Sequence, residues 1–246
     1  MILTAKQIEY MRYACSVTRD LHAELAKRCK VGTKLSELND FAEKFIREHN
    51  CKPNFKGVGG FPFSICASLN NEVVHGRPDS RIVQKGDLVK IDLGCSYNGI
   101  HSDAARTLVM EGASDTAIKL AEVAKQCFFE GLKGIKAGSS VNQIGYQVQK
   151  YVERHGFSVV RDMCGHGIGT KLHMEPDVLN FDYPPLRHII LNENEAIAVE
   201  PMVNEFDCEV DYDKRTLLCT TADGGLSAHY ENTVLITNEG VEILTL

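Results

Sequence analysis

The feature that most constrains the fold of this chain is a weak internal repeat. The segment KVGTKLSEL, which starts at Lys30, recurs as KAGSSVNQI from Lys136, a shift of 136 − 30 = 106 residues. In both copies a glycine and a hydroxyl residue precede apolar residues at helical spacing, so Thr33 and Ser139 are the predicted N-caps of two equivalent helices. The repeat favours two duplicated and fused halves, with a chance match between amphipathic helices as the alternative. Other superimposed pairs are Gly32 with Gly138, Leu35 with Val141, Leu38 with Ile144, Phe45 with Tyr151, Ile46 with Val152, and His49 with His155.

Each half of the chain reads as two helices followed by strands. A second helical pattern lies upstream of each copy, at 4–29 and 115–133. After each helix pair the apolar period changes to two, which is typical of strands. We therefore expect one α/β (α+β) domain over residues 1–246, with halves of about 1–112 and 113–246 whose strands form one sheet covered by helices. The predicted strands are 87–93, 101–110 after a turn at Asn98-Gly99, 195–203 and 226–237.

The composition excludes several classes of protein. Hydrophobic residues make up 43% and charged residues 24%, the balance of a soluble globular chain. There are 27 basic and 33 acidic side chains, so the net charge is −6, and no basic cluster indicates a nucleic-acid partner. No apolar run approaches the roughly 18 residues of a membrane span, and the N-terminus lacks the apolar core of a signal peptide. Nine cysteines without a CxxC pair indicate reduced thiols. These features predict a cytoplasmic enzyme.

Carboxylates within apolar strand patterns are the strongest chemical signal. Asp92 lies in KIDLG, and Asp103 follows it by 103 − 92 = 11 residues on the predicted return strand. The second half repeats this with Glu200 in IAVEPM and Glu231 in AHYENT. Acids at such positions are costly to bury unless they are paired or bind a metal ion. Two acids from each half therefore predict a cation site where the halves meet.

The alternative is that these acids are solvated or paired with basic residues, and Arg106 is close enough in sequence to pair with Asp103. The apolar surroundings of Glu200 argue against it, and we favour metal binding for the set. Four carboxylates suit two divalent cations, and an imidazole ligand would favour Mn²⁺, Fe²⁺, Co²⁺ or Zn²⁺ over Ca²⁺.

The histidine ligand is predicted from local context. His166 lies in CGHGIG, where the glycines leave room for a ligand to approach the backbone, and His173 follows in KLHMEP. Cys66 and Cys164 have no motif that supports a nucleophilic role, so a buried apolar role is favoured for the cysteines. The sequence contains no GxGxxG, Walker A, HExxH or GxSxG motif. The histidine candidates are His75, His101, His166, His173, His188 and His229.

Taken in order, these motifs resemble those of the type I methionine aminopeptidases, over essentially the whole chain. The resemblance implies the pita-bread fold, in which pseudo-twofold halves and their helices cover a curved antiparallel sheet, in agreement with the repeat. The residues that carry it are Asp92 in KIDLG, Asp103 in HSDAART, His166 in GHGIG, Glu200 in VEPM and Glu231 in HYENT.

The resemblance also implies roles for the ligands. Asp103 and Glu231 would bridge two metal ions. His166 and Glu200 would complete the ligand shell of the first ion, and Asp92 would complete that of the second. Glu200 would act as the general base toward a water of lowered pKa. The free amine of the substrate would bind near Asp92.

Two further histidines and an apolar pocket follow from the same resemblance. His75, in NNEVVHGRP, matches a histidine on the substrate side, and His173 matches one that would hydrogen-bond the scissile carbonyl. The family's pocket usually includes a tryptophan where this chain, which has none, has Leu217. An enlarged or looser apolar pocket is therefore expected. The segment 204–216 carries more charge than the family leads us to expect and is predicted to form a mobile rim. The other pocket residues are Phe61, Cys66 and Leu172.

The function implied is removal of the initiator methionine from new polypeptides, with a preference for a small second residue, by a monomer. An Xaa-Pro aminopeptidase or dipeptidase of the same fold is the second hypothesis. It usually carries an extra N-terminal domain, for which the first predicted helix leaves no room. A binding protein that has lost its metals is the third, and the five retained ligands argue against it.

Overall fold

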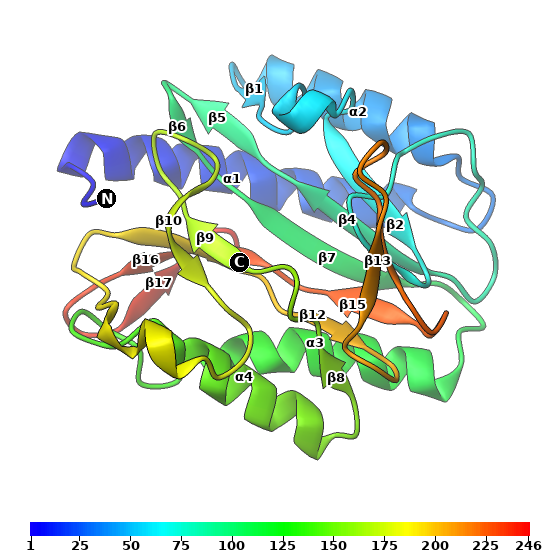
Figure 1. Cartoon of the computed structure of the whole chain (residues 1–246). Helices are drawn as coiled ribbons and strands as arrows, with labels where there is room; N and C mark the ends of the chain where they lie inside the picture. Colours follow the sequence, from blue (N-terminus) through cyan, green and yellow to red (C-terminus); the bar gives the residue numbers. More distant parts are fainter.

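Two helix pairs enclose the strands in the computed structural model, which describes residues 1–246. In Figure 1 the first pair lies along the upper part of the molecule and the second along the lower part, with the strands between them. The helices confirm the four that the apolar periodicity predicts. They are α1 (Ala5–Arg28), α2 (Leu35–Glu48), α3 (Asp115–Gly131) and α4 (Asn142–Arg154).

The predicted N-caps of α2 and α4 are wrong in the same way. The capping positions are Lys34 and Val141, and neither side chain makes a capping hydrogen bond. Thr33 Oγ1 instead accepts from Lys30 N at 3.2 Å and donates to Arg28 O at 3.0 Å, and Ser139 Oγ accepts from Lys136 N at 3.1 Å. Each hydroxyl closes the turn before its helix, which is the other local use of Ser and Thr.

The backbone around these turns shows the repeat directly. Gly32 N donates to Val83 O and Val83 N donates back to Thr33 O, both at 2.9 Å. In the second half, Gly138 N donates to Leu191 O and Leu191 N to Ser139 O, also at 2.9 Å. The same pairing recurs at matching positions, which favours duplication over a chance match.

Six strands of the first half form two antiparallel groups. The larger has the order β2 (Ile65–Leu69), β4 (Leu88–Leu93) and β7 (Ala104–Val109), and the smaller has the order β1 (Lys52–Pro53), β5 (Cys95–Tyr97) and β6 (Ile100–His101). Asn98 and Gly99 have φ of 49° and 78°, as a two-residue hairpin turn requires, so the predicted turn is confirmed. The predicted strand 101–110 is interrupted at Ser102 and Asp103.

The strands of the second half extend this arrangement. One group has the order β10 (Met174–Val178), β9 (Gly165–Gly167), β11 (Ala196–Val199), β16 (Asn232–Ile236) and β17 (Val241–Ile243). A second has the order β15 (Ser227–His229), β12 (Met202–Asn204) and β8 (Ser158–Val159). A third joins β13 (Val210–Tyr212) through β14 (Cys219–Thr221) to β3 (Glu72–Val74). Short 3₁₀ turns lie at Val58–Gly60 and Pro184–His188.

Two predicted strands, 195–203 and 226–237, bend at the same level. The first breaks at Glu200-Pro201, between β11 and β12, and the second at Tyr230-Glu231, between β15 and β16. Pro201 has no N–H to continue a ladder. β11 pairs with β16, and β12 pairs with β15. The two segments therefore break at the same place, and both glutamates lie at this break.

The two halves are hydrogen-bonded to each other beside this bend. Ala105 N donates to Glu231 O at 3.3 Å, and Glu231 N donates to Ala105 O at 3.0 Å. Thr233 Oγ1 accepts from Asp103 N at 2.9 Å and donates to Asp103 O at 2.8 Å. One buried hydroxyl therefore fixes the backbone of a first-half carboxylate against a second-half strand.

Replacing Thr233 with valine is expected to lower the free energy of unfolding by about 1–3 kcal/mol, because the N–H and C=O of Asp103 lose their buried partner. Urea unfolding in the presence of a chelator measures the effect without a contribution from bound metal. Thr233→Ser keeps the hydroxyl, so its free energy of unfolding should fall by less than that of the valine variant. An unchanged urea midpoint for the valine variant would contradict the role given to this hydroxyl.

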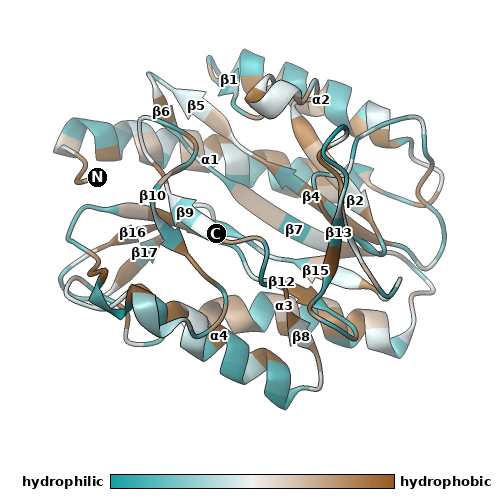
Figure 2. Ribbon diagram, viewed as in Figure 1, coloured by the Kyte–Doolittle hydropathy of each residue, from teal (hydrophilic) through white to brown (hydrophobic).

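Apolar packing holds each helix pair against its strands. In the first half, α1 and α2 pack on β2 and β4 through Leu21, Leu38 and Ile91. In the second half, α3 lies against β12 and β15 and α4 against β8 and β10, and residues such as Phe128 and Val148 belong to their shared apolar core. Hydrophilic residues occupy the outward faces of α2 and α4 (Figure 2). All nine cysteines are free, and seven are buried, as predicted. None of the helices combines the length and apolar character needed to cross a membrane.

Candidate metal centre and substrate cleft

The strand bends open into a cleft of about 270 Å³. Every metal, catalytic and pocket residue that the sequence predicts lines it. They are Asp92, Asp103, His166, Glu200, Glu231, His75, His173, Phe61, Cys66, Leu172 and Leu217.

The four carboxylates reach the cleft from both halves. Asp92 lies within β4, opposite Ala105 of β7, and faces away from the apolar core that takes its neighbours Ile91 and Leu93. The other three lie where strands begin or end, because a strand break lets a side chain leave the alternating pattern. Asp103 precedes β7, Glu200 follows β11, and Glu231 precedes β16.

These carboxylates have no basic partner. Asp103 is 3% exposed and Glu231 2%, and neither forms an ion pair with a lysine or arginine. Arg106 instead donates to the carbonyls of Ala105, Glu231 and Thr245 and to the side chain of Asn232. One oxygen each of Asp92, Asp103 and Glu231 is buried without any hydrogen-bond partner. The alternative in which Arg106 pairs with Asp103 is therefore wrong.

Burial and mutual repulsion oppose negative charge in this cluster. Burial raises the pKa of Asp92 to about 7. It raises the pKa values of Asp103, Glu200 and Glu231 well above their ordinary range, and the neighbouring carboxylates raise them further. Such a group of acids needs protons or cations for neutrality. The unpartnered oxygens and the donor set fit divalent cations.

His166, on β9, supplies the predicted imidazole. Its Nδ1–H donates to Gly167 O at 2.9 Å, which leaves the Nε2 lone pair 3.7 Å from Asp103 Oδ2 and 3.5 Å from Glu200 Oε1. Burial lowers its pKa to about 4, so the ring is neutral, as a metal ligand must be. Ligand atoms of Asp103, His166 and Glu231 lie within 4.8 Å of one another.

The glycines around His166 serve packing between strands rather than ligand access, which corrects the sequence interpretation. A Cβ on Gly165 would lie 2.3 Å from Ala198 O of β11. One on Gly167 would lie 2.1 Å from Glu175 O of β10. Only glycine lets the three strands approach this closely, and the approach places His166 between the carboxylates.

His75 and His173 complete the polar lining. His75 follows β3 with a φ of 61°, and its Nδ1–H donates to Leu217 O at 3.1 Å. Leu217 itself has a φ of 67°. Such strained backbone persists where surrounding contacts hold it, often at functional sites. The ring of His173 packs edge-on against that of His166, with centroids 4.5 Å apart.

Sequence reasoning missed part of the apolar wall. Phe55, Val58, Gly59 and Tyr212 also line the cleft. Tyr212 belongs to the charged segment 204–216, so this segment does form part of the rim. The one sequence signal for the role of Tyr212 is that it is an aromatic residue within a charged segment.

The remaining histidine candidates lie outside the cleft. His188 is exposed at a 3₁₀ turn, and His101 accepts from Asn54 Nδ2 at 3.4 Å. His229 is buried behind Glu200, with its Nε2 3.9 Å from Glu200 Oε2. Sequence reasoning named His229 without giving it a role.

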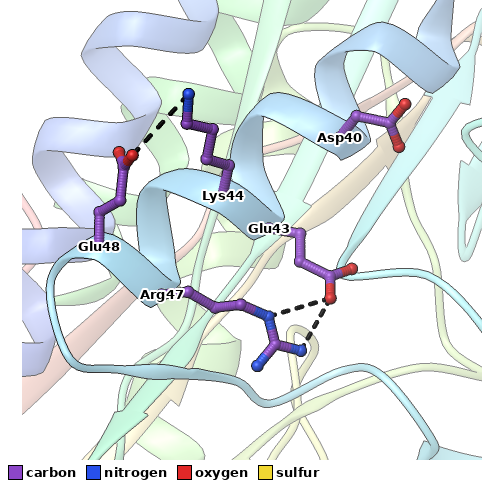
Figure 3. A pocket seen from close by; sticks show the side chains of 5 residues that line it. All are labelled: Asp40, Glu43, Lys44, Arg47 and Glu48. Atoms are coloured by element: carbon purple, nitrogen blue, oxygen red, sulfur yellow. Dashed lines mark hydrogen bonds and ion pairs between the residues drawn. The ribbon is translucent and has the colours of Figure 1, made fainter.

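A second hollow, on the outer face of α2, has no such character. Figure 3 shows that its lining consists of charged side chains. Arg47 donates to Glu43 at 2.8 Å and Lys44 lies 3.8 Å from Glu48, so these charges are already paired. This hollow is a solvated helix surface rather than a site.

Known proteins share both sequence and fold with this chain. The sequence pattern of metallopeptidase family M24 matches residues 9–238. The methionine aminopeptidase of Clostridium acetobutylicum is 42% identical, over 98% of this chain and 96% of the relative. Methionine aminopeptidase 1 of Bacillus subtilis is 39% identical, over 98% of this chain and 97% of the relative.

Solved structures agree with these relatives. The crystal structure of the methionine aminopeptidase from Thermotoga maritima superimposes with a TM-score of 0.96 at 34% identity, over 100% of this chain and 98% of that one. The prolidase of Pyrococcus furiosus, at 21% identity and a TM-score of 0.79, shares the fold, and this chain covers 65% of its length. The predicted pita-bread fold is thus confirmed. The chain belongs to the methionine aminopeptidases of metallopeptidase family M24.

Proposed function

We propose that this protein removes the N-terminal methionine from newly made polypeptides, with two divalent cations in the cleft. One observation carries the proposal: four buried or half-buried carboxylates without a lysine or arginine partner meet a neutral histidine beside an apolar pocket. Family membership supports it. The candidate metals are Mn²⁺, Fe²⁺, Co²⁺ and Zn²⁺, since carboxylates and one imidazole suit all four.

The resemblance to the family implies the ligand roles, and the shared cleft supports them. Asp103 and Glu231 would hold both cations, Asp92 would complete the second site, and His166 and Glu200 the first. When bound, divalent cations lower the pKa of water enough to supply hydroxide near neutral pH. Glu200 is the carboxylate that would accept a proton from the attacking water and return it to the leaving amine.

The two other histidines act on the substrate. His173 directs its ring into the cleft and would donate a hydrogen bond to the scissile carbonyl as negative charge develops. His75 is held by Leu217 O through Nδ1, so its Nε2 is free to face the peptide. The substrate's free ammonium group would bind beside Asp92, which restricts cleavage to the first residue.

The apolar wall would receive the methionine side chain. Replacing Leu172 with alanine should lower kcat/KM for a Met-Ala peptide about tenfold or more, because binding loses apolar contact in a small pocket. Kinetics across a series of first residues measures this change. Leu172→Met, which nearly conserves volume, is the matched control. An unchanged preference in the alanine variant would remove Leu172 from the pocket.

The decisive assay of function uses chelated protein supplied with each candidate cation. Metal-dependent release of methionine from Met-Gly and Met-Ala peptides, and weaker release from Met-Lys peptides, is expected. Faster cleavage of Xaa-Pro than of Met-Ala substrates would favour the Xaa-Pro aminopeptidase instead. Failure to bind any divalent cation would favour a non-catalytic binding protein. We further propose that residues 1–246 act as a single catalytic domain, as a monomer in the cytoplasm.

A further inference from the structure

His229 is the most unusual polar side chain outside the cleft. It is 1% exposed, and neither Nδ1 nor Nε2 has a hydrogen-bond partner. Leaving a buried polar group unpaired destabilises the folded state. His22 is also buried, yet its Nε2 meets Ala104 O at 2.9 Å. The fold therefore can satisfy a buried histidine, and at His229 it does not.

The backbone of His229 is held firmly. Its N–H donates to Thr107 Oγ1 at 2.9 Å, and its C=O accepts from the same hydroxyl at 2.8 Å. Residue 229 also pairs with Met202 in the β12–β15 ladder. Its neighbour Ala228 packs into the second-half core, so alternation turns the ring of His229 to the opposite face.

On that face the ring meets Glu200. The carboxylate of Glu200 lies between two imidazoles: Oε1 is 3.5 Å from His166 Nε2, and Oε2 is 3.9 Å from His229 Nε2. The second distance is longer than a hydrogen bond, so a small rotation or one bridging water would complete it. His229 is not among the residues that line the cleft, and the nearest charged group of the cleft to its ring is the carboxylate of Glu200.

We propose that His229 is a positioning residue that donates Nε2–H to Glu200 Oε2, fixes the rotation of that carboxylate, and reserves Oε1 for the cation beside His166. The inference rests on the proposed dimetal function. Outer partners of this kind orient metal ligands and tune their affinity. The otherwise unpaired ring thereby gains the acceptor that it lacks.

The test compares His229→Leu, which removes the donor, with His229→Gln, which keeps an N–H. Val148→Ala, on the buried face of α4, controls for a general loss of stability. Calorimetric titration of chelated protein with Mn²⁺ gives the affinity of the tighter site. The visible spectrum of the Co²⁺-loaded protein reports the ligand geometry.

His229→Leu is expected to weaken the tighter Mn²⁺ site about 10–100-fold and to change the Co²⁺ spectrum, with kcat reduced similarly. His229→Gln should recover most of the affinity, and Val148→Ala should keep it while melting at a lower temperature. Wild-type affinity and spectrum in His229→Leu would overturn the proposal, as would a glutamine variant no better than leucine.

A second measurement needs only the wild-type protein, in case the leucine variant does not fold. The ring nitrogens of ¹⁵N-histidine-labelled protein report which nitrogen carries the proton. The proposal requires the Nε2–H tautomer at His229, and an Nδ1–H tautomer would overturn it. If wild-type protein binds metal but cleaves no Met peptide, the proposed function fails while the metal-affinity result for His229 still stands on its own.

Discussion

Replacing Glu200 with glutamine is expected to lower kcat for a Met-Ala peptide about a thousandfold or more, the upper range for losing a general base. Glutamine fills the same space at the bend between β11 and β12, so the fold should persist. It cannot accept the proton from water or return it to the leaving amine. Release of methionine, measured by chromatography at saturating Mn²⁺, gives the effect.

Metal occupancy decides how the Glu200 result is interpreted, because Glu200 is also a proposed ligand. Elemental analysis of each variant separates loss of metal from loss of the proton acceptor. Glu193→Gln, at an exposed position seven residues earlier in the chain, is the matched control and should behave as wild type. A fully loaded Glu200→Gln enzyme with near wild-type kcat would rule out the base role.

Replacing Asp103 with asparagine is expected to abolish tight metal binding and reduce turnover to background, because this carboxylate is proposed to hold both cations. Without metal the variant should be at least as stable as wild type. Burial and the charges of Asp92 and Glu200 raise the pKa of Asp103, which means that its ionised form destabilises the fold. Asparagine removes that charge at nearly constant volume.

Thermal unfolding with and without Mn²⁺ tests the Asp103 prediction. A ligand at 100 times its Kd stabilises the folded state by about 2.7 kcal/mol. For a chain of this size that corresponds to a rise in Tm of about 5–10 °C. Wild-type protein should show this rise and Asp103→Asn should not. An equal rise in both proteins would exclude Asp103 as a principal ligand.

Local patterns in the sequence predicted much of the fold. Apolar periodicity located α1 to α4, and Asn98-Gly99 located a hairpin, because these signals depend on neighbouring residues alone. The N-caps at Thr33 and Ser139 were wrong, since a hydroxyl before a helix can bond either forward to the helix or back to the preceding turn. Which of the two bonds forms depends on the backbone groups that the fold places beside the hydroxyl.

The strand breaks could not be predicted from alternation. Glu200 and Glu231 lie in continuous apolar patterns, yet both strands bend there because β11 and β12 pair with β16 and β15 and the ladder stops at Pro201. The glycines at 165 and 167 were misinterpreted for a related reason. What fills the space beside a glycine is another strand, which is remote in sequence.

The sequence by itself determined which side chains are proposed to carry the chemistry: four acids in apolar surroundings and His166, in an order that identifies the family. Tertiary structure alone decided that these acids lack basic partners, that Arg106 bonds carbonyls instead of Asp103, and that Phe55 and Tyr212 join the pocket. It also placed His229 behind Glu200. The physical reason is that burial and long-range contacts set the energy of a charge, and both arise only when the two halves meet.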